Sequence, residues 1–143
     1  FSMGFNTQLT YGNWDLSMVL RGNFGNYVYN NVYSNLGARQ SYSFAGYLNN
    51  VSRNILDTDF SNYQLLSDYY VENASFVRMD NISLGYNFGK VIGDRVGLRA
   101  TASVQNAFVI SNYNGIDPEH SSGIDYSLYP RPRVFSVGLN VNL

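Results

Sequence analysis

The sequence contains no cysteine, only three prolines, a single histidine and few charged residues. Without cysteine the chain has neither a disulfide framework nor a thiolate metal site. Charged residues make up 13% of the chain, about half of the roughly 25% found in soluble domains. The net charge of −1 gives no basic footprint for nucleic acid. No run of about 20 apolar residues occurs, so the sequence contains no membrane-spanning helix.

Aromatic and alternating residues are abundant instead. Tyr, Phe and Trp make up 16% of the chain, and hydrophobic residues make up 45%. The mean hydropathy is −0.20, but a barrel strand needs only about 10 alternating residues, whose average hydropathy is near zero. Few charges and many aromatic residues fit a barrel whose outer surface meets lipid and whose interfaces carry aromatic girdles.

The final stretch of the chain alternates with a period of two, which is typical of a β-strand. Its apolar positions are Phe135, Val137, Leu139, Val141 and Leu143. Between them lie Ser136, Gly138, Asn140 and Asn142, which are small or polar and uncharged. We expect the apolar set to face lipid and the polar set to face a wet lumen. A resemblance to outer-membrane proteins that end in an apolar residue implies that this apolar set is also the signal read by the barrel-assembly machinery. A strand of a soluble β-sandwich alternates too, so this stretch alone leaves both folds open.

Four more segments alternate in the same way, and the predicted fold class is all-β. Gly12-Asn13 supplies a two-residue turn, residues 89–94 supply a second short turn, and a change of phase near Asp80 indicates a bulge or a strand rising above the membrane. The sequence thus predicts an antiparallel meander of five transmembrane strands near 1–11, 14–25, 75–88, 95–110 and 133–143.

Two long stretches, about 26–73 and 111–132, separate these strands and are rich in Tyr and Asn. Spacing of Phe44, Leu48, Val51 and Ile55 predicts a short helix near 43–56. Short turns alternate with long loops, which in outer-membrane barrels face the periplasm and the outside respectively. Tyr and Asn give adaptable contacts. We therefore expect contacts with a substrate, or with a protein that covers the loops as a lid, at Tyr113, Asn114, Asp117, Tyr126 and Tyr129. Packing within the loops is an equally good interpretation for any single Tyr.

Five strands cannot close a barrel, since closure needs at least about eight. An open sheet would leave both edges unpaired in lipid. We therefore interpret residues 1–143 as one portion of a larger barrel, beginning within the first alternating strand.

Four ordered motifs carry a resemblance to a known family. They are YVENASFVRMDNISLGYNF at 70–88, LRATASVQNAF at 98–108, YNGIDPE at 113–119 and YPRPRVF at 129–135. Together they resemble the C-terminal barrel segment of SusC/RagA-class TonB-dependent outer-membrane transporters. The match covers residues 70–143 well and the first hairpin only generally. Leu143 stands where such barrels often end in Phe, which preserves the apolar character.

The resemblance implies a plugged barrel of about 22 strands that imports glycans or peptides. It implies a SusD-like surface lipoprotein as a lid, and contact with the TonB complex through an N-terminal part. We expect that part and the plug domain to be absent from this chain. The expected localisation is the bacterial outer membrane, with the long loops extracellular. No cofactor, metal or nucleic acid is implied.

Catalytic and metal-binding interpretations are weaker. His120 lies near Ser121, Ser122 and Asp125, but we expect it in a solvated loop rather than in a triad. Asp57, Asp59 and Asn62 could offer oxygens to a hard cation, yet a solvated turn is the better interpretation. The alternative to a transporter is a soluble β-sandwich module that binds carbohydrate or another ligand, and an outer-membrane enzyme is a distant third.

Overall fold

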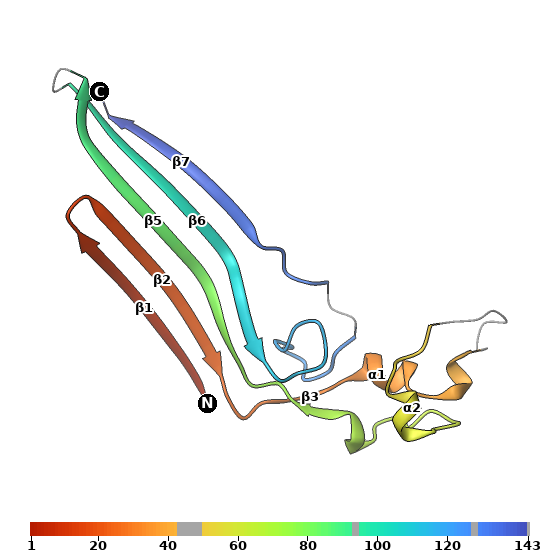
Figure 1. Ribbon diagram of the computed structural model, residues 1–143. Helices are drawn as coiled ribbons and strands as arrows, with labels where there is room; N and C mark the ends of the chain where they lie inside the picture. Colours follow the sequence, from red (N-terminus) through yellow and green to blue (C-terminus); the bar gives the residue numbers. More distant parts are fainter. Residues whose placement is uncertain (43–49, 93–94, 127–128, 143) are drawn as a thin grey trace. The chain divides into compact units, whose positions relative to one another are not determined.

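The computed structural model describes residues 1–42, 50–92, 95–126 and 129–142, which form two compact units (Figure 1). The sheet unit comprises Phe1–Phe24, Phe76–Ser111 and Arg131–Leu143. The loop unit comprises Gly25–Ser75 and Asn112–Pro130. The two long stretches predicted as loops therefore fold together, although they are separated in the sequence by two strands.

The sheet unit is one layer of five antiparallel strands in the order β1-β2-β5-β6-β7. This confirms the predicted meander. The strands are β1 (Ser2–Tyr11), β2 (Trp14–Asn23), β5 (Phe76–Ile92), β6 (Val96–Ser111) and β7 (Val134–Asn142).

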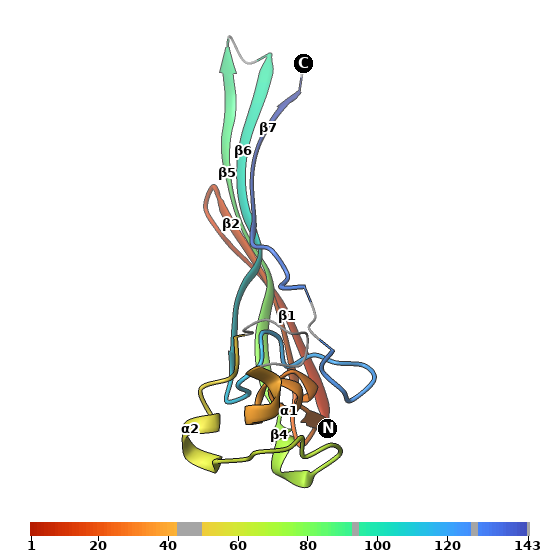
Figure 2. The same cartoon turned by 90° about the vertical axis from the view of Figure 1, so that its right-hand side faces the viewer.

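The two short connections differ from each other. Gly12 has a φ of +58° in the tight turn between β1 and β2, as its sequence predicts. β5 instead continues to Ile92, so the second turn begins later than the predicted 89. Because Trp14 pairs with Tyr86, β5 and β6 extend beyond the β1–β2 hairpin at that end of the sheet (Figure 2).

A bulge interrupts the sheet at Asp80, as the change of phase indicated. Met79 pairs with Leu20 and Asn81 with Val19, so Asp80 is the extra residue against β2. On the other side the register shifts again, and Asn106 of β6 lies in the left-handed region with a φ of +51°. A bulge of this kind moves the next side chains to the opposite face. It thereby returns Met79 and Val77 to the same face as Ile82.

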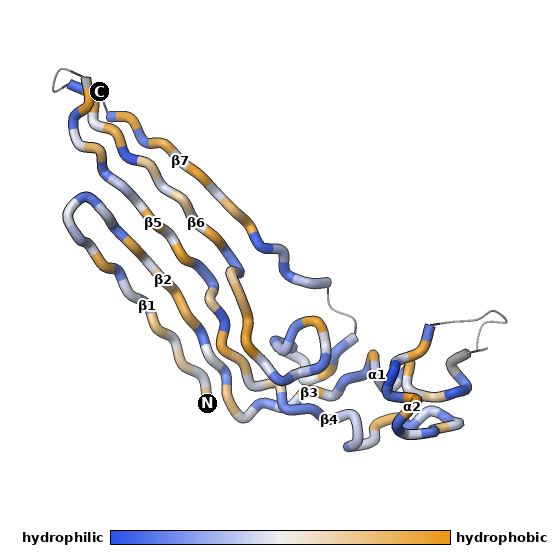
Figure 3. The backbone as a smooth tube through the Cα atoms, viewed as in Figure 1, coloured by the Kyte–Doolittle hydropathy of each residue, from blue (hydrophilic) through white to orange (hydrophobic). Residues whose placement is uncertain are grey.

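The register gives the sheet two faces of different chemistry, because directly paired residues of antiparallel strands lie on the same face. Val137 pairs with Ala102, which pairs with Leu84, which pairs with Leu16. Ser136, Ser103, Ser83 and Ser17 form the equivalent row on the other face. Figure 3 shows the alternation along each strand. The described apolar residues of β7, from Phe135 to Val141, are 56–85% exposed on the apolar face.

The loop unit contains short elements. A two-stranded sheet pairs β3 (Tyr27–Tyr29) with β4 (Val71–Asn73), and the helices α1 (Asn31–Leu36) and α2 (Ile55–Thr58) lie in the same unit. Single 3₁₀ turns are η1 (Arg39–Tyr42) and η2 (Asp68–Tyr70). Val28, Ala74 and Tyr113 form a buried cluster.

The predicted helix near 43–56 is wrong in its described part. Residues 50–54 are not helical, and a helix of four residues begins only at Ile55. The left-handed conformation of Asp59 ends this helix after one turn. Residues 43–49 lie outside the described part of the chain.

Candidate functional site

Backbone hydrogen bonds join the two long stretches of the loop unit. The Tyr29 N–H donates to the carbonyl of Gly123 at 2.9 Å, and the Asp125 N–H donates to the carbonyl of Tyr29 at 2.9 Å. These two bonds form a parallel bridge between Tyr29 and Ile124. Residues 123–125 therefore lie beside β3, which places the second stretch against the first without a regular strand of its own.

The Glu72 carboxylate is the centre of a polar network that holds this arrangement. It accepts hydrogen bonds from Asn30 Nδ2 at 2.9 Å, from the Asn114 N–H at 3.0 Å and from Asn114 Nδ2 at 2.9 Å. Asn30 is fully buried, and its Oδ1 accepts from the Tyr33 N–H at 3.0 Å as the N-cap of α1. One carboxylate of β4 therefore connects the start of α1 with the second long stretch.

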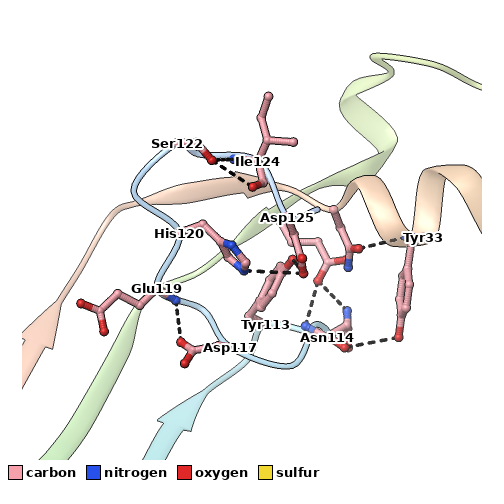
Figure 4. A network of polar contacts seen from close by, with 11 residues as sticks. Tyr33, Tyr113, Asn114, Asp117, Glu119, His120, Ser122, Ile124 and Asp125 are labelled. Atoms are coloured by element: carbon pink, nitrogen blue, oxygen red, sulfur yellow. Dashed lines mark hydrogen bonds and ion pairs between the residues drawn. The ribbon is translucent and has the colours of Figure 1, made fainter. Parts of the chain in front are cut away.

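A second network surrounds Asp125 (Figure 4). The Tyr113 hydroxyl donates to Asp125 Oδ2 at 2.8 Å, and His120 Nε2 lies 3.6 Å from the same oxygen. All three side chains are buried. Burial, followed by the hydrogen bond to Asp125, raises the pKa of Tyr113 above its ordinary value, so the hydroxyl stays protonated and continues to donate.

Gly115 is required by this packing. A Cβ at Gly115 would lie 2.2 Å from the Tyr113 ring and 2.7 Å from Asp125 Oδ2. Any side chain there would displace the ring or the carboxylate, so the YNG sequence at 113–115 is a packing motif of the loop unit.

The structure separates the five predicted contact residues into two groups. Tyr113 and Asp117 are buried, and Asp117 Oδ1 accepts from the Glu119 N–H at 2.9 Å. Asn114 is exposed but bonded to Glu72. Tyr126 and Tyr129 are exposed, Tyr129 to 86%. The first three residues therefore take part in the packing of the loop unit. Contact with cargo or a lid stays a prediction for all five, and Tyr126 and Tyr129 are the two whose side chains are exposed without a bond described above.

His120 corrects the sequence analysis, which expected a solvated side chain. Its side chain is only 3% exposed and packs against Tyr113 with ring centroids 6.0 Å apart. The sequence analysis also missed Glu72 and Asn30, because their partnership joins residues from opposite ends of the long stretch. The one available signal was the position of Glu72 inside the motif at 70–88.

The His120 and Asp125 pair does not form a triad with Ser122. The Ser122 hydroxyl donates to the carbonyl of Ile124 at 3.0 Å. The considered cation ligand Asp59 forms an ion pair with Arg39. Across residues 1–42, 50–92, 95–126 and 129–142, no three His, Cys, Asp or Glu side chains are grouped so that they could hold a metal ion.

The polar face of the sheet unit carries its own ion pairs. Arg21 of β2 binds the carboxylate of Asp80 at the bulge, and Arg99 of β6 binds Asp15 of β2 at 2.7 Å. Near the end of β5, a groove of about 500 Å³ is lined by Asn87, Lys90, Arg99, Asn140 and Asn142, among others. This face therefore presents amides and charged side chains, as expected for a hydrated wall.

Among the described residues, no helix is long and apolar enough to cross a membrane.

No protein-family model matches the chain. It is 39% identical to the TonB-dependent receptor SusC of Bacteroides thetaiotaomicron over 97% of its own length, and 31% identical to the TonB-dependent receptor P3 of Formosa agariphila over 99%. It spans 15% and 16% of those receptors. Among solved structures, the RagAB peptide importer in its closed-closed state matches with a TM-score of 0.77 at 20% identity, over 98% of this chain and 17% of that one. The RagAB peptide transporter matches with a TM-score of 0.75 at 19% identity, over 96% and 16%. At this identity the structures show the fold alone.

Proposed function

We propose that the loop unit of this chain is an extracellular recognition module for imported glycans or peptides. The premise is that the chain belongs to the SusC/RagA class of TonB-dependent outer-membrane transporters and forms part of their β-barrel. The sheet unit is the wall that carries this module. The observation that supports the proposal most directly is the ordering of the loop unit by two polar networks. The network around Glu72 joins the two distant stretches, and the buried network around Asp125 orders the second stretch.

The strand register supports the proposed sidedness of the long loops. Asn23, Phe76 and Ser111 are paired with one another, so both long connections leave the sheet from the same end. The turn at Gly12 and the connection that follows Ile92 lie at the other end. In outer-membrane barrels the short turns face the periplasm, which supports our proposal that the loop unit is extracellular.

The chemistry of the module suits cargo recognition rather than catalysis. Tyr126 and Tyr129 expose aromatic rings, which stack on sugar rings and pack against peptide side chains. Buried carboxylates and amides hold the surrounding backbone in one conformation, which reduces the entropy lost on binding. SusC is a receptor and RagAB is a peptide importer. Neither ordering the loops nor contacting cargo needs a cofactor.

The proposed partners are those of the class. A SusD-like surface lipoprotein closes over the module, and the plug and the TonB complex act through parts of the receptor beyond this chain. The edge strands β1 and β7 pair with further strands of a barrel of about 22 strands. The similarity to TonB-dependent receptors does not favour the alternative of a soluble β-sandwich module.

The test replaces Tyr126 and Tyr129 with Ala together in the full-length receptor and measures uptake of labelled oligosaccharides and peptides by whole cells. We expect uptake to fall severalfold while the amount of barrel in the outer membrane is unchanged. Tyr11→Ala is the matched control, because Tyr11 is equally exposed at 86% but flanks the turn at the other end of the sheet. Full uptake by the double variant would refute the recognition role.

A further inference from the structure

Asn114 and Gly115 form the only Asn-Gly step in the sequence. In such a step the glycine nitrogen can attack Cγ of the asparagine side chain, because glycine has no Cβ to hinder the approach. A bond forms between this nitrogen and Cγ, the Cγ–Nδ2 bond breaks, and the side-chain amide leaves as ammonia with the proton of the glycine nitrogen. Water then opens the cyclic imide to aspartate or isoaspartate. The net change is the loss of ammonia, the uptake of water and a new carboxylate.

The packing of the loop unit keeps glycine at this position. A Cβ at Gly115 would lie 2.2 Å from the Tyr113 ring and 2.7 Å from Asp125 Oδ2, and both of these side chains are buried. Any other residue would therefore displace a close-packed contact. The step that favours cyclisation is thus retained because the fold requires the small residue that follows Asn114.

The Glu72 carboxylate holds Asn114 in the folded loop unit. Its Oε2 accepts hydrogen bonds from Asn114 Nδ2 at 2.9 Å and from the Asn114 N–H at 3.0 Å. The Asn114 carbonyl accepts from the Tyr33 hydroxyl at 3.4 Å. Cyclisation requires rotation of the side chain and the backbone of Asn114, so these bonds must open first. The Glu72 network therefore slows the reaction, although Asn114 itself is exposed to water.

The product cannot make the same contacts. Deamidation replaces Nδ2, which donates, with a carboxylate oxygen, which only accepts. Two carboxylates then meet where the Asn114 amide faced Glu72, and like charges so close together repel. Turning Glu72 away is unfavourable, because its Oε1 also accepts from Asn30 Nδ2 at 2.9 Å and Asn30 is fully buried. An isoaspartate also adds a methylene to the main chain, which shifts Gly115 against Tyr113.

We propose that Asn114 is a site of spontaneous deamidation, and that its conversion releases the second long stretch of the loop unit from Glu72. No step returns the amide, so the reaction is a one-way switch from the bonded to the open form of residues 112–126. Opening speeds deamidation and deamidation favours opening, so the two processes reinforce each other. The inference does not depend on the proposed function, because it concerns only contacts within the loop unit.

The first experiment measures deamidation in the full-length receptor, solubilised in detergent and incubated at mildly alkaline pH. Peptide mass spectrometry follows the mass gained when an amide becomes a carboxylate. Within residues 1–143, we expect Asn114 to convert before any other asparagine. Receptor unfolded in urea should convert faster than folded receptor. Glu72→Ala should convert roughly tenfold faster than the parent or more, because it removes hydrogen bonds to a charged group.

The second experiment places the product in the chain. Asn114→Asp should raise the hydrogen–deuterium exchange of residues 112–126, whereas amides of β5 and β6 should exchange as before. Asn112→Asp is the matched control, because it adds the same charge at an exposed position of the same stretch, and it should change little. Adding Glu72→Gln to Asn114→Asp should restore part of the protection, because an amide then faces the new carboxylate.

Four results would overturn the inference. Conversion of another asparagine of residues 1–143 before Asn114 would show that Asn114 is not the preferred site. Equal rates in the folded parent and in Glu72→Ala would show that the Glu72 network does not protect it. Equal protection of residues 112–126 in Asn114→Asp and in Asn112→Asp would show that the product does not release the second stretch. No recovery in the double variant would exclude repulsion between the two carboxylates as the cause.

Discussion

Replacing Glu72 with Ala should release the second long stretch of the loop unit while leaving the sheet intact. The variant loses three hydrogen bonds at once, two from Asn114 and one from Asn30. It leaves the Asn30 amide, which is buried, without its acceptor. Hydrogen bonds to a charged group contribute roughly 1.5–3 kcal/mol each, but the two from Asn114 are exposed to solvent and contribute less. We expect the opening free energy of residues 112–126 to fall by about 2–4 kcal/mol.

Hydrogen–deuterium exchange followed by mass spectrometry measures this loss directly. In the full-length receptor, amides within residues 112–126 should exchange roughly 30- to 1,000-fold faster than in the parent protein. Amides of β5 and β6 should exchange as before, because their ladder hydrogen bonds do not involve Glu72.

Two variants make the measurement specific. Glu72→Gln should give an intermediate effect, since its single carbonyl oxygen can still accept but its amide group faces the donors of Asn30 and Asn114. Asp57→Ala removes an exposed acid of the same unit and should change little. If residues 112–126 remain as protected in Glu72→Ala as in the parent, the Glu72 network does not hold the loop unit together.

Three further predictions concern the wall, the buried tyrosines and assembly. Leu139→Arg places a charge on the apolar face of β7 and should destabilise the barrel by roughly 2–4 kcal/mol if the site lies near the midplane. Heat-dependent electrophoretic mobility measures this loss, and Asn140→Arg on the polar face is the control. Equal melting of the two variants would contradict the prediction that Leu139 faces lipid. Burial raises the pKa values of Tyr113 and Tyr70, so their contribution to the stability of the loop unit should be constant below about pH 10 and should fall above it, where these tyrosines ionise only in the unfolded state. A tyrosinate absorbance titration should lose a late component in Tyr113→Phe, and a titration like that of the parent would exclude this assignment. Deleting residues 141–143, of which Leu143 lies outside the described part, should abolish insertion by the assembly machinery, and normal surface levels of the truncated receptor would disprove an assembly signal.

The local sequence pattern marked the bulge at Asp80, but it did not determine which tyrosines of the second stretch are exposed. The change of phase before Asn81 left a bulge or a strand rising above the membrane as the two interpretations, because an extra residue inverts the alternation of its neighbours. The strand register shows the bulge. The exposure of each Tyr depends on which other segment covers it. Composition alone therefore could not distinguish Tyr113, which is buried beside Asp125, from Tyr129, which is exposed.

The sequence by itself determined the five strands, their meander and the chemistry of the two faces of the sheet. Each of these depends on contacts between residues that are close in the chain or on a period of two, which any reader of the sequence can count. Only the tertiary structure decided that the two long stretches form one unit, that Glu72 connects Asn30 with Asn114, and that His120 is buried. Glu72 lies 42 residues from Asn30 and 42 residues from Asn114, and neither pairing follows a period. Their pairing is set by which backbone segments dock together, and that is a property of the folded chain alone.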